Sequence, residues 1–408
     1  MATGRAARRC LLPLCVLCVA LCSPVEGHVD KKVQPGESSG EIVQADQLVV
    51  RALPGLTSSL MMPFTTVLKV VKLSKVRYNR AEGIFLGVSP PQLRLADFEL
   101  SGYVGYGFES YRWRYEIGLK RSWFWTNTLE FGVAHYDVTD TMDRWIVSGL
   151  ENSLAALLFR EDFMDYFRRK GWRFHASQRI SETYVLGLEL RTDRYETMKK
   201  RTDWSIFGGD KEFRLNPPVV QGRMESIVAT AQIDLMGYRK GWTFQGEYEK
   251  AGDPFGGDYD FHRIWLQGKR YQPTIGNQRA VIHLMAGLHR GTLPEQKRFD
   301  VGGIESLRGY PFKAFTGNRM LLGNVYYLFG GDLLGRTGIP VVKSLQLILF
   351  SDTGVAFDQF HGLQLRDLKT DIGVALADME NTLRINLAKR LDRGGEPIEI
   401  TVRLLRKY

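Results

Sequence analysis

Apolar and polar residues alternate with a period of two from about Arg77 to the C-terminus. The stretch 98–108 shows the pattern well. One side carries Phe98, Leu100, Gly102, Val104, Tyr106 and Phe108, and the other carries Glu99, Ser101, Tyr103 and Gly105. Alternation over about ten residues predicts β-strands with one apolar face and one polar face.

The same pattern predicts sixteen strands. They cover 80–88, 98–108, 112–120, 128–136, 172–179, 184–194, 203–207, 225–236, 242–250, 261–271, 280–290, 320–329, 345–357, 370–377, 383–391 and 398–408, of which 203–207 is the weakest. A soluble barrel has the same alternation as a membrane barrel with lipid outside and water inside, so periodicity alone does not separate the two.

One segment has helical spacing instead. Ser148-Gly149-Leu150-Glu151 has the capping-box arrangement, in which the serine accepts a backbone N–H and the glutamate reaches back. Leucines at 150, 154, 157 and 158 follow at the period of an α-helix. Counting strands from a periplasmic start places this helix on the periplasmic side. It either covers the barrel base, meets a partner or serves simple packing.

The N-terminus predicts export. Basic residues at positions 5, 8 and 9 precede an apolar run over 10–21, which is typical of a cleaved signal peptide over 1–27, with cleavage after Cys22 or Gly27. The run is too short for a membrane-spanning helix, which needs about 20 residues. We therefore predict a bacterial outer-membrane protein with three parts: the signal peptide 1–27, a short periplasmic segment over 28–76 and a transmembrane barrel over 77–408.

Composition narrows the chemistry. All four cysteines lie in the predicted signal peptide, so the mature chain has no disulfide framework and no thiolate metal site. The full chain has a net charge of +10, and removing three arginines and one glutamate with residues 1–27 leaves +8. This excess either favours anionic lipid headgroups or lines a wet lumen and loops. We expect no nucleic-acid partner.

No catalytic, cofactor or metal site is expected. The chain contains no Walker loop, His-Glu-x-x-His motif or Rossmann fingerprint, and no Gly-x-Ser-x-Gly nucleophile elbow is expected anywhere in it. Acidic residues at 161, 162 and 165 follow the predicted helix, and we expect them to be solvated rather than to bind metal. The predicted activity is therefore not enzymatic.

A glycine-rich stretch from Val301 to Phe329 carries the most specific motif. Leu307-Arg308-Gly309-Tyr310 follows Gly302-Gly303 and precedes Gly317-Asn318, and Leu349-Phe350-Ser351-Asp352-Thr353-Gly354 lies about forty residues further on. This combination resembles the outer-membrane assembly barrel superfamily, the BamA/TamA-like or bacterial surface antigen family. The resemblance implies an all-β fold, a 16-stranded antiparallel transmembrane β-barrel with a long lumen-inserted loop, here with one short helical insertion.

The resemblance also implies a site. Arg308 in the loop would pair with Asp352 on the thirteenth strand and hold the loop to the inner wall, with Gly302, Gly303, Gly309 and Tyr310 shaping the loop. Tyr408 would be the C-terminal aromatic residue by which barrels are recognised for insertion. The sequence departs from the family pattern in three places: Tyr326-Tyr327-Leu328 replaces Glu-Tyr-Arg, Asn386 replaces aspartate, and Arg406 stands at a usually apolar position.

The implied function is assistance in inserting or translocating proteins or lipids at the outer membrane. Outer-membrane lipids, and unfolded outer-membrane proteins as clients, are the expected partners. The segment 28–76 is too short for the periplasmic POTRA domains of relatives, so a short form without them is expected. Gly83, Gly87 and two prolines predict a weak first strand and an openable seam with the last strand. The alternative is a passive pore or a structural barrel.

Overall fold

The computed structural model describes one β-rich unit of the 408-residue chain. The described residues are 72–89, 93–95, 97–123, 128–237, 239–330, 345–359, 364–378, 382–392 and 395–404. All of them belong to the second of two units, which begins at Ile42. The predicted signal peptide, residues 28–71 of the predicted periplasmic segment, and Tyr408 lie outside the described residues.

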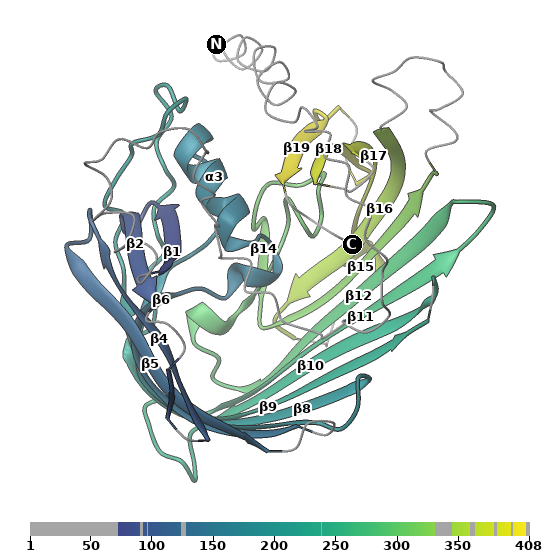
Figure 1. Ribbon diagram of the computed structural model, residues 1–408. Helices are drawn as coiled ribbons and strands as arrows, with labels where there is room; N and C mark the ends of the chain where they lie inside the picture. Colours follow the sequence, from purple (N-terminus) through teal and green to yellow (C-terminus); the bar gives the residue numbers. More distant parts are fainter. Residues whose placement is uncertain are drawn as a thin grey trace, which may run out of the picture. The chain divides into compact units, whose positions relative to one another are not determined.

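Most of the described chain forms one antiparallel sheet, shown in Figure 1. Its strands are β1 (Lys72–Asn79), β2 (Gly83–Ser89), β3 (Leu93–Leu95), β4 (Phe98–Gly107), β5 (Arg112–Trp123), β6 (Leu129–Asp140), β7 (Phe167–Arg179), β8 (Tyr184–Thr197), β9 (Gly222–Met236), β10 (Gly241–Ala251), β11 (Phe261–Pro273), β12 (Arg279–Gly291), β15 (Arg319–Leu328), β16 (Leu345–Phe357), β17 (Lys369–Asp378), β18 (Leu383–Arg390) and β19 (Glu399–Leu404). A separate small hairpin pairs β13 (Phe299–Val301) with β14 (Phe315–Gly317).

The strand predictions are correct for most of the sheet, with two errors that cancel in the count. The segment 203–207 is not a strand, and β1 adds a strand before the first predicted one. Arg80, predicted to begin a strand, lies in the turn of the β1–β2 hairpin. The sheet has 17 strands, but β2 and β3 pair with successive parts of β4 and share one position, which leaves 17 − 1 = 16 positions.

The predicted ladder between the first and last strands is not among the described pairings. Each registered ladder in the described part of the chain joins neighbouring positions, from β1–β2 to β18–β19. The structure therefore shows a large antiparallel sheet of sixteen positions, and closure into a barrel stays a prediction. We use the word seam for the boundary between β1 and β19.

The outer face of the sheet is apolar. In β8, for example, Leu186, Leu188 and Leu190 are each about half exposed and alternate with polar residues that face the other side. Exposed aliphatic and aromatic side chains in strict alternation are typical of a lipid-facing sheet. Among the described residues, no helix is long and apolar enough to cross a membrane.

Helix α3 (Gly149–Phe159) lies in the insert, residues 141–166, between β6 and β7, after the short 3-10 helix η1 (Asp143–Trp145). As predicted, Ser148 is the N-cap and accepts a hydrogen bond from the Glu151 backbone N–H. The leucine stripe is only half-buried, whereas Glu151, Asn152 and Ala156 are the buried residues. The helix therefore turns the polar side chains of Glu151 and Asn152 inward, while Leu157 packs against a small buried cluster around Ala156.

The strand count behind the predicted periplasmic position of α3 is off by one, because β1 precedes the first predicted strand. Connections in an antiparallel meander alternate between the two edges of the sheet. Five strand positions precede the insert and eleven precede the connection between β12 and β15. Both connections therefore leave from one edge, opposite the edge where β1 begins. We call it the loop edge. The additional strand β1 changed the count by one.

Candidate functional site

The arginine loop, residues 302–314, connects β13 to β14 and is shaped by its glycines. Gly302 and Gly303 have positive φ values of 127° and 85°. A Cβ atom at Gly302 would lie 2.5 Å from the Pro311 carbonyl oxygen, and one at Gly303 would lie 2.7 Å from the Phe312 Cα. Only glycine fits this backbone without strain. The loop can therefore fold back tightly and present Arg308 to the sheet.

Arg308 meets Asp352 of β16 in a buried, bidentate ion pair. The Arg308 Nε donates to Asp352 Oδ2 at 2.8 Å and Nη2 donates to Oδ1 at 2.6 Å. The two side chains are 1% and 0% exposed. The Arg308 guanidinium also lies over the Phe350 ring, 3.5 Å from its centre, and 4.8 Å from the centre of Tyr326. The parallel-fork geometry is the strongest form of arginine–carboxylate contact.

Two residues that the sequence interpretation missed complete this site. Asn324 of β15 donates to Asp352 Oδ1 at 2.7 Å and to the Ser306 carbonyl at 2.8 Å. Asp371 of β17 accepts the Gly309 backbone N–H at 2.9 Å. Asp371 is the cross-strand partner of Asp352, so the register of β16 and β17 was the signal that could have identified Asp371. The loop is thus fixed by three neighbouring strands.

Gly309 and Tyr310 also contact the wall of the sheet. A Cβ atom at Gly309 would lie 2.8 Å from both the Arg390 backbone nitrogen and the Asp371 Cβ, so the loop backbone approaches the sheet too closely for a side chain. The Tyr310 hydroxyl donates to the Thr370 carbonyl at 3.3 Å. The structure therefore brings Gly302, Gly303, Arg308, Gly309, Tyr310 and Asp352 into one site.

The departures from the family pattern have structural substitutes. Tyr326 is buried and packs against the Arg308 guanidinium, so an aromatic face replaces a carboxylate next to this cation. Asn386 of β18 is fully buried and donates to the Thr401 hydroxyl at 2.9 Å. Both changes remove a charge from the interior, and each new side chain still contacts a neighbouring residue.

A second buried cation, Arg403 of β19, connects the last strand to the insert and to the arginine loop. Its Nε and Nη2 donate to the two carboxylate oxygens of Glu151 at 2.7 and 3.0 Å, and its Nη1 donates to Glu305 at 2.5 Å. The Glu151 carboxylate also accepts the Leu404 backbone N–H at 2.8 Å. Glu151 therefore contacts β19 instead of completing the predicted capping box.

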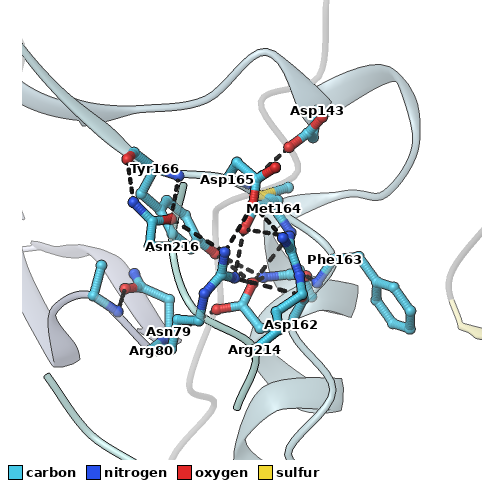
Figure 2. A network of polar contacts seen from close by, with 12 residues as sticks. Asn79, Arg80, Asp143, Asp162, Phe163, Met164, Asp165, Tyr166, Arg214 and Asn216 are labelled. Atoms are coloured by element: carbon cyan, nitrogen blue, oxygen red, sulfur yellow. Dashed lines mark hydrogen bonds and ion pairs between the residues drawn. The ribbon is translucent and has the colours of Figure 1, made fainter. Parts of the chain in front are cut away.

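The first hairpin is held by the same insert. Figure 2 shows Arg80, in the β1–β2 turn, surrounded by acceptors from the segment that follows α3. The Arg80 guanidinium donates to the Met164 carbonyl at 2.5 Å and to Asp165 at 2.8 Å, and it forms an ion pair with Asp162 at 3.2 Å. The Ser153 hydroxyl of α3 accepts the Tyr78 backbone N–H at 3.2 Å. The insert therefore joins both sides of the seam.

Lys313 of the arginine loop forms the third contact with the insert. Its Nζ lies 2.8 Å from Asp143, 2.7 Å from Asp165 and 3.0 Å from Asp300. Burial raises the pKa of the Asp143 carboxyl, although Lys313 opposes the shift. For Asp165, burial also favours the neutral form, but Lys313 and Arg214 outweigh it and lower the pKa. One ammonium group thus stabilises a set of carboxylates that would otherwise repel each other.

Apolar packing accompanies these polar contacts. Ala81 of the first hairpin, Ile304 of the arginine loop, and Ile146, Val147 and Met164 of the insert form one buried cluster. The insert therefore belongs to the same core as the arginine loop and the first hairpin.

Of the three acidic residues after α3, Glu161 is exposed to solvent as predicted, whereas Asp162 and Asp165 are not. Asp162 is buried and Asp165 is mostly buried, and both are paired with Arg80, while Glu161 pairs with Lys211 at the surface. Within the described ranges, no group of three or more histidine, cysteine or acidic residues is arranged to hold a metal ion. These carboxylates instead compensate buried arginine.

Lys313→Met is expected to loosen the arginine loop in a pH-dependent way. Loss of the ammonium raises the pKa of the neighbouring carboxylates, and groups with a raised pKa in the folded state lose stability as pH rises through that range. The variant should therefore differ most from the parent at pH 7 and least near pH 3. Limited proteolysis between residues 302 and 318 measures this. Lys211→Met, at an exposed ion pair, is the control. A pH-independent difference would contradict the assignment.

One sequence prediction needs a correction of its own. Gly36-Glu37-Ser38-Ser39-Gly40 fits the bare Gly-x-Ser-x-Gly pattern. The segment lies outside the described residues, and its neighbouring sequence lacks the apolar strand that precedes the serine in a nucleophile elbow. The motif therefore adds no catalytic candidate to the site.

The fold and site together define a class of protein: a large antiparallel sheet with an apolar outer face, against which a glycine-rich loop is fixed by a buried arginine–aspartate pair. Comparisons with known proteins agree. Residues 238–377 match the Omp85 superfamily domain, and residues 64–254 match the C-terminal domain of a family of unknown function, DUF5686. The chain belongs to the Omp85 superfamily, as a BamA/TamA-like member.

Individual relatives are distant. The outer membrane protein assembly factor BamA of Nitratidesulfovibrio vulgaris is 26% identical over 245 residues, which are 54% of this chain and 29% of that protein. The BamA crystal structure from Haemophilus ducreyi, which lacks POTRA domains 1–3, matches with a TM-score of 0.51 and 13% identity over 80% of this chain and 68% of that one. CdiB from Acinetobacter baumannii has a TM-score of 0.42 at 10% identity, covering 81% of this chain and 58% of that one.

Proposed function

We propose that this protein assists the insertion or translocation of proteins or lipids at the bacterial outer membrane, and that the seam between β1 and β19 is its working part. The observation that carries the proposal is the insert, which contacts both sides of the seam. Superfamily membership supports this proposal, because a BamA outer membrane protein assembly factor is among the relatives of the chain. In this proposal, opening of the seam provides the physical mechanism for insertion or translocation.

Side-chain contacts through the insert connect the two sides of the seam. Within the sheet, by comparison, β11 and β12 share thirteen registered backbone pairs. At the seam, the described connection runs through side chains: Glu151 to Arg403 on one side, and Arg80 to Asp162 and Asp165 on the other. Separating a few ion pairs exposes the edges of β1 and β19 without unfolding either strand. Exposed edges offer backbone groups that can pair with an incoming strand.

The arginine loop has a positioning role in this proposal. Arg308 fixes the loop to β16, and Glu305 of the same loop contacts Arg403 of β19. Lys313 contacts the insert. The loop thus holds the insert and the last strand in a fixed relation, and the proposal needs no catalytic residue or energy source.

A reversible cross-link across the seam contact tests the proposal. The Glu151→Cys and Arg403→Cys double variant, joined by a bifunctional methanethiosulfonate reagent, links α3 to β19. The mature chain has no other cysteine after predicted cleavage. We expect cells that depend on this variant to lose particular outer-membrane proteins or lipids when cross-linked and to recover them with reductant. Gln245→Cys with Gln267→Cys, which are partners within the β10–β11 ladder, is the matched control.

The opposing result is specific. An unchanged outer-membrane proteome and lipid composition, both in cross-linked cells and in cells lacking the protein, would overturn the assembly role. Steady ion conductance that persists after cross-linking would then support the alternative of a passive pore.

A further inference from the structure

A basic pocket lies at the loop edge, separate from the arginine loop. Its volume is about 240 Å³. It is lined by the turn after β4, the first residues of β5 and β7, and the segment that follows β8. Its charged lining consists of Arg112, Arg114, Arg168, Glu196, Lys199 and Arg201. Five cations and one carboxylate give the lining a net charge of 5 − 1 = +4.

Two of the cations form a fixed floor. Arg114 is buried and its Nη1 contacts Asp137 at 3.3 Å. Arg168 donates to Asp137 through Nε at 2.8 Å and to Glu196 through Nη1 at 2.7 Å. Two carboxylates lie beneath the lining, Asp137 and the buried Glu82, which is 4.0 Å from the Arg114 Nε, and they leave a net charge of 4 − 2 = +2. The floor arginines are therefore held in place and compensated, and the excess charge of the pocket lies on the other three cations.

The other three cations surround the opening. Arg112, Lys199 and Arg201 are exposed, and within the described part of the chain their side chains form no hydrogen bond or ion pair. Like charges gathered around a concave surface repel each other, and a pocket focuses their field. None of these three side chains makes a described contact that stabilises the sheet. The stability of the fold therefore does not explain why three cations gather here.

From this geometry, we propose that the pocket binds a phosphoryl group. Guanidinium groups recognise phosphate through paired N–H donors, and lysine adds a mobile point charge. Ser110 also lines the pocket. The loop edge carries the insert and the arginine loop, and long connections mark the outward side of membrane barrels. Two sources of the group fit this position, a phosphorylated lipid headgroup and free inorganic pyrophosphate. The site does not depend on seam opening.

The test compares two triple variants of the full-length protein in detergent. Arg112→Gln, Lys199→Gln and Arg201→Gln remove the three unpaired cations. The control, Arg239→Gln, Lys240→Gln and Arg290→Gln, removes the same charge at exposed positions outside the pocket. Calorimetric titration with inorganic pyrophosphate should give salt-sensitive binding that is at least tenfold weaker in the pocket variant and within twofold of the parent in the control.

A second arm identifies the source. Nanodiscs containing diphosphorylated lipid A are compared with nanodiscs containing the dephosphorylated lipid. Binding of the phosphorylated lipid that is lost in the pocket variant, with no pyrophosphate binding, assigns the site to a lipid headgroup. Pyrophosphate binding alone assigns it to the free anion. Equal binding by the pocket variant and the control variant, or binding of neither probe by the parent protein, would overturn the proposal.

Discussion

Arg308→Ala is expected to lower the free energy of unfolding by about 3–5 kcal/mol, since removing one partner of a buried ion pair leaves the other charge without compensation. Asp352 is fully buried and lies next to Asp371 in the β16–β17 register. Without the guanidinium, two carboxylates would face each other in the interior. Urea unfolding of the protein in detergent, followed by tryptophan fluorescence, measures the loss.

A double-mutant cycle separates the ion pair from general packing. Arg308→Met and Asp352→Asn are made singly and together, so that each single variant removes one charge and the double variant removes both. The double variant should be more stable than Arg308→Met alone, because the carboxylate is no longer stranded. Arg298→Ala, at a partly exposed ion pair, should change stability by less than about 1 kcal/mol. Equal losses in Arg308→Met and in the double variant would show that the pair does not hold the loop.

The second large effect is expected at Arg403. Arg403→Met removes the cation shared by Glu151 and Glu305 and leaves two buried carboxylates close together. The local cost is again about 3–5 kcal/mol. Because the lost contacts lie at the seam, we expect faster hydrogen exchange in β1, β2, β18 and β19, with β10 and β11 unchanged. Hydrogen–deuterium exchange with mass spectrometry resolves these segments.

Glu151→Gln provides the matched control for this prediction. It keeps the size of the side chain and leaves Arg403 paired with Glu305, so the exchange rates at the seam should rise less than in Arg403→Met. Adding Glu151→Gln to Arg403→Met should recover part of the stability, since one of the stranded carboxylates is removed. A uniform rise in exchange throughout the sheet would mean that Arg403 supports global stability and not the seam.

The insert connects these two predictions. It contacts the first hairpin through Asp162, the last strand through Glu151, and the arginine loop through Asp143 and Asp165. A disturbance at Arg308 therefore has a physical path to the seam through Lys313 and Glu305. Coupling between the Arg308 and Arg403 variants, measured by their non-additivity, would quantify this path.

The sequence by itself determined most of the strands and the central ion pair. Strand faces follow from a local period of two, which each segment carries in its own residues. The loop motif then carried the resemblance to the assembly-barrel family, and that resemblance pointed to the contact between Arg308 and Asp352. The N-cap of α3 was also local, because Ser148 needs only the backbone of Glu151.

Only the tertiary structure decided what the polar residues of the insert contact. Glu151 and Arg403 are 252 positions apart, and Arg80 and Asp162 are 82 positions apart. No local pattern separates a glutamate that closes a capping box from one that binds a distant arginine. Burial settles the choice: an arginine enclosed in the interior requires a carboxylate, and the nearest one comes from whichever segment the topology brings there. The edge on which the insert lies depended in the same way on one strand, β1.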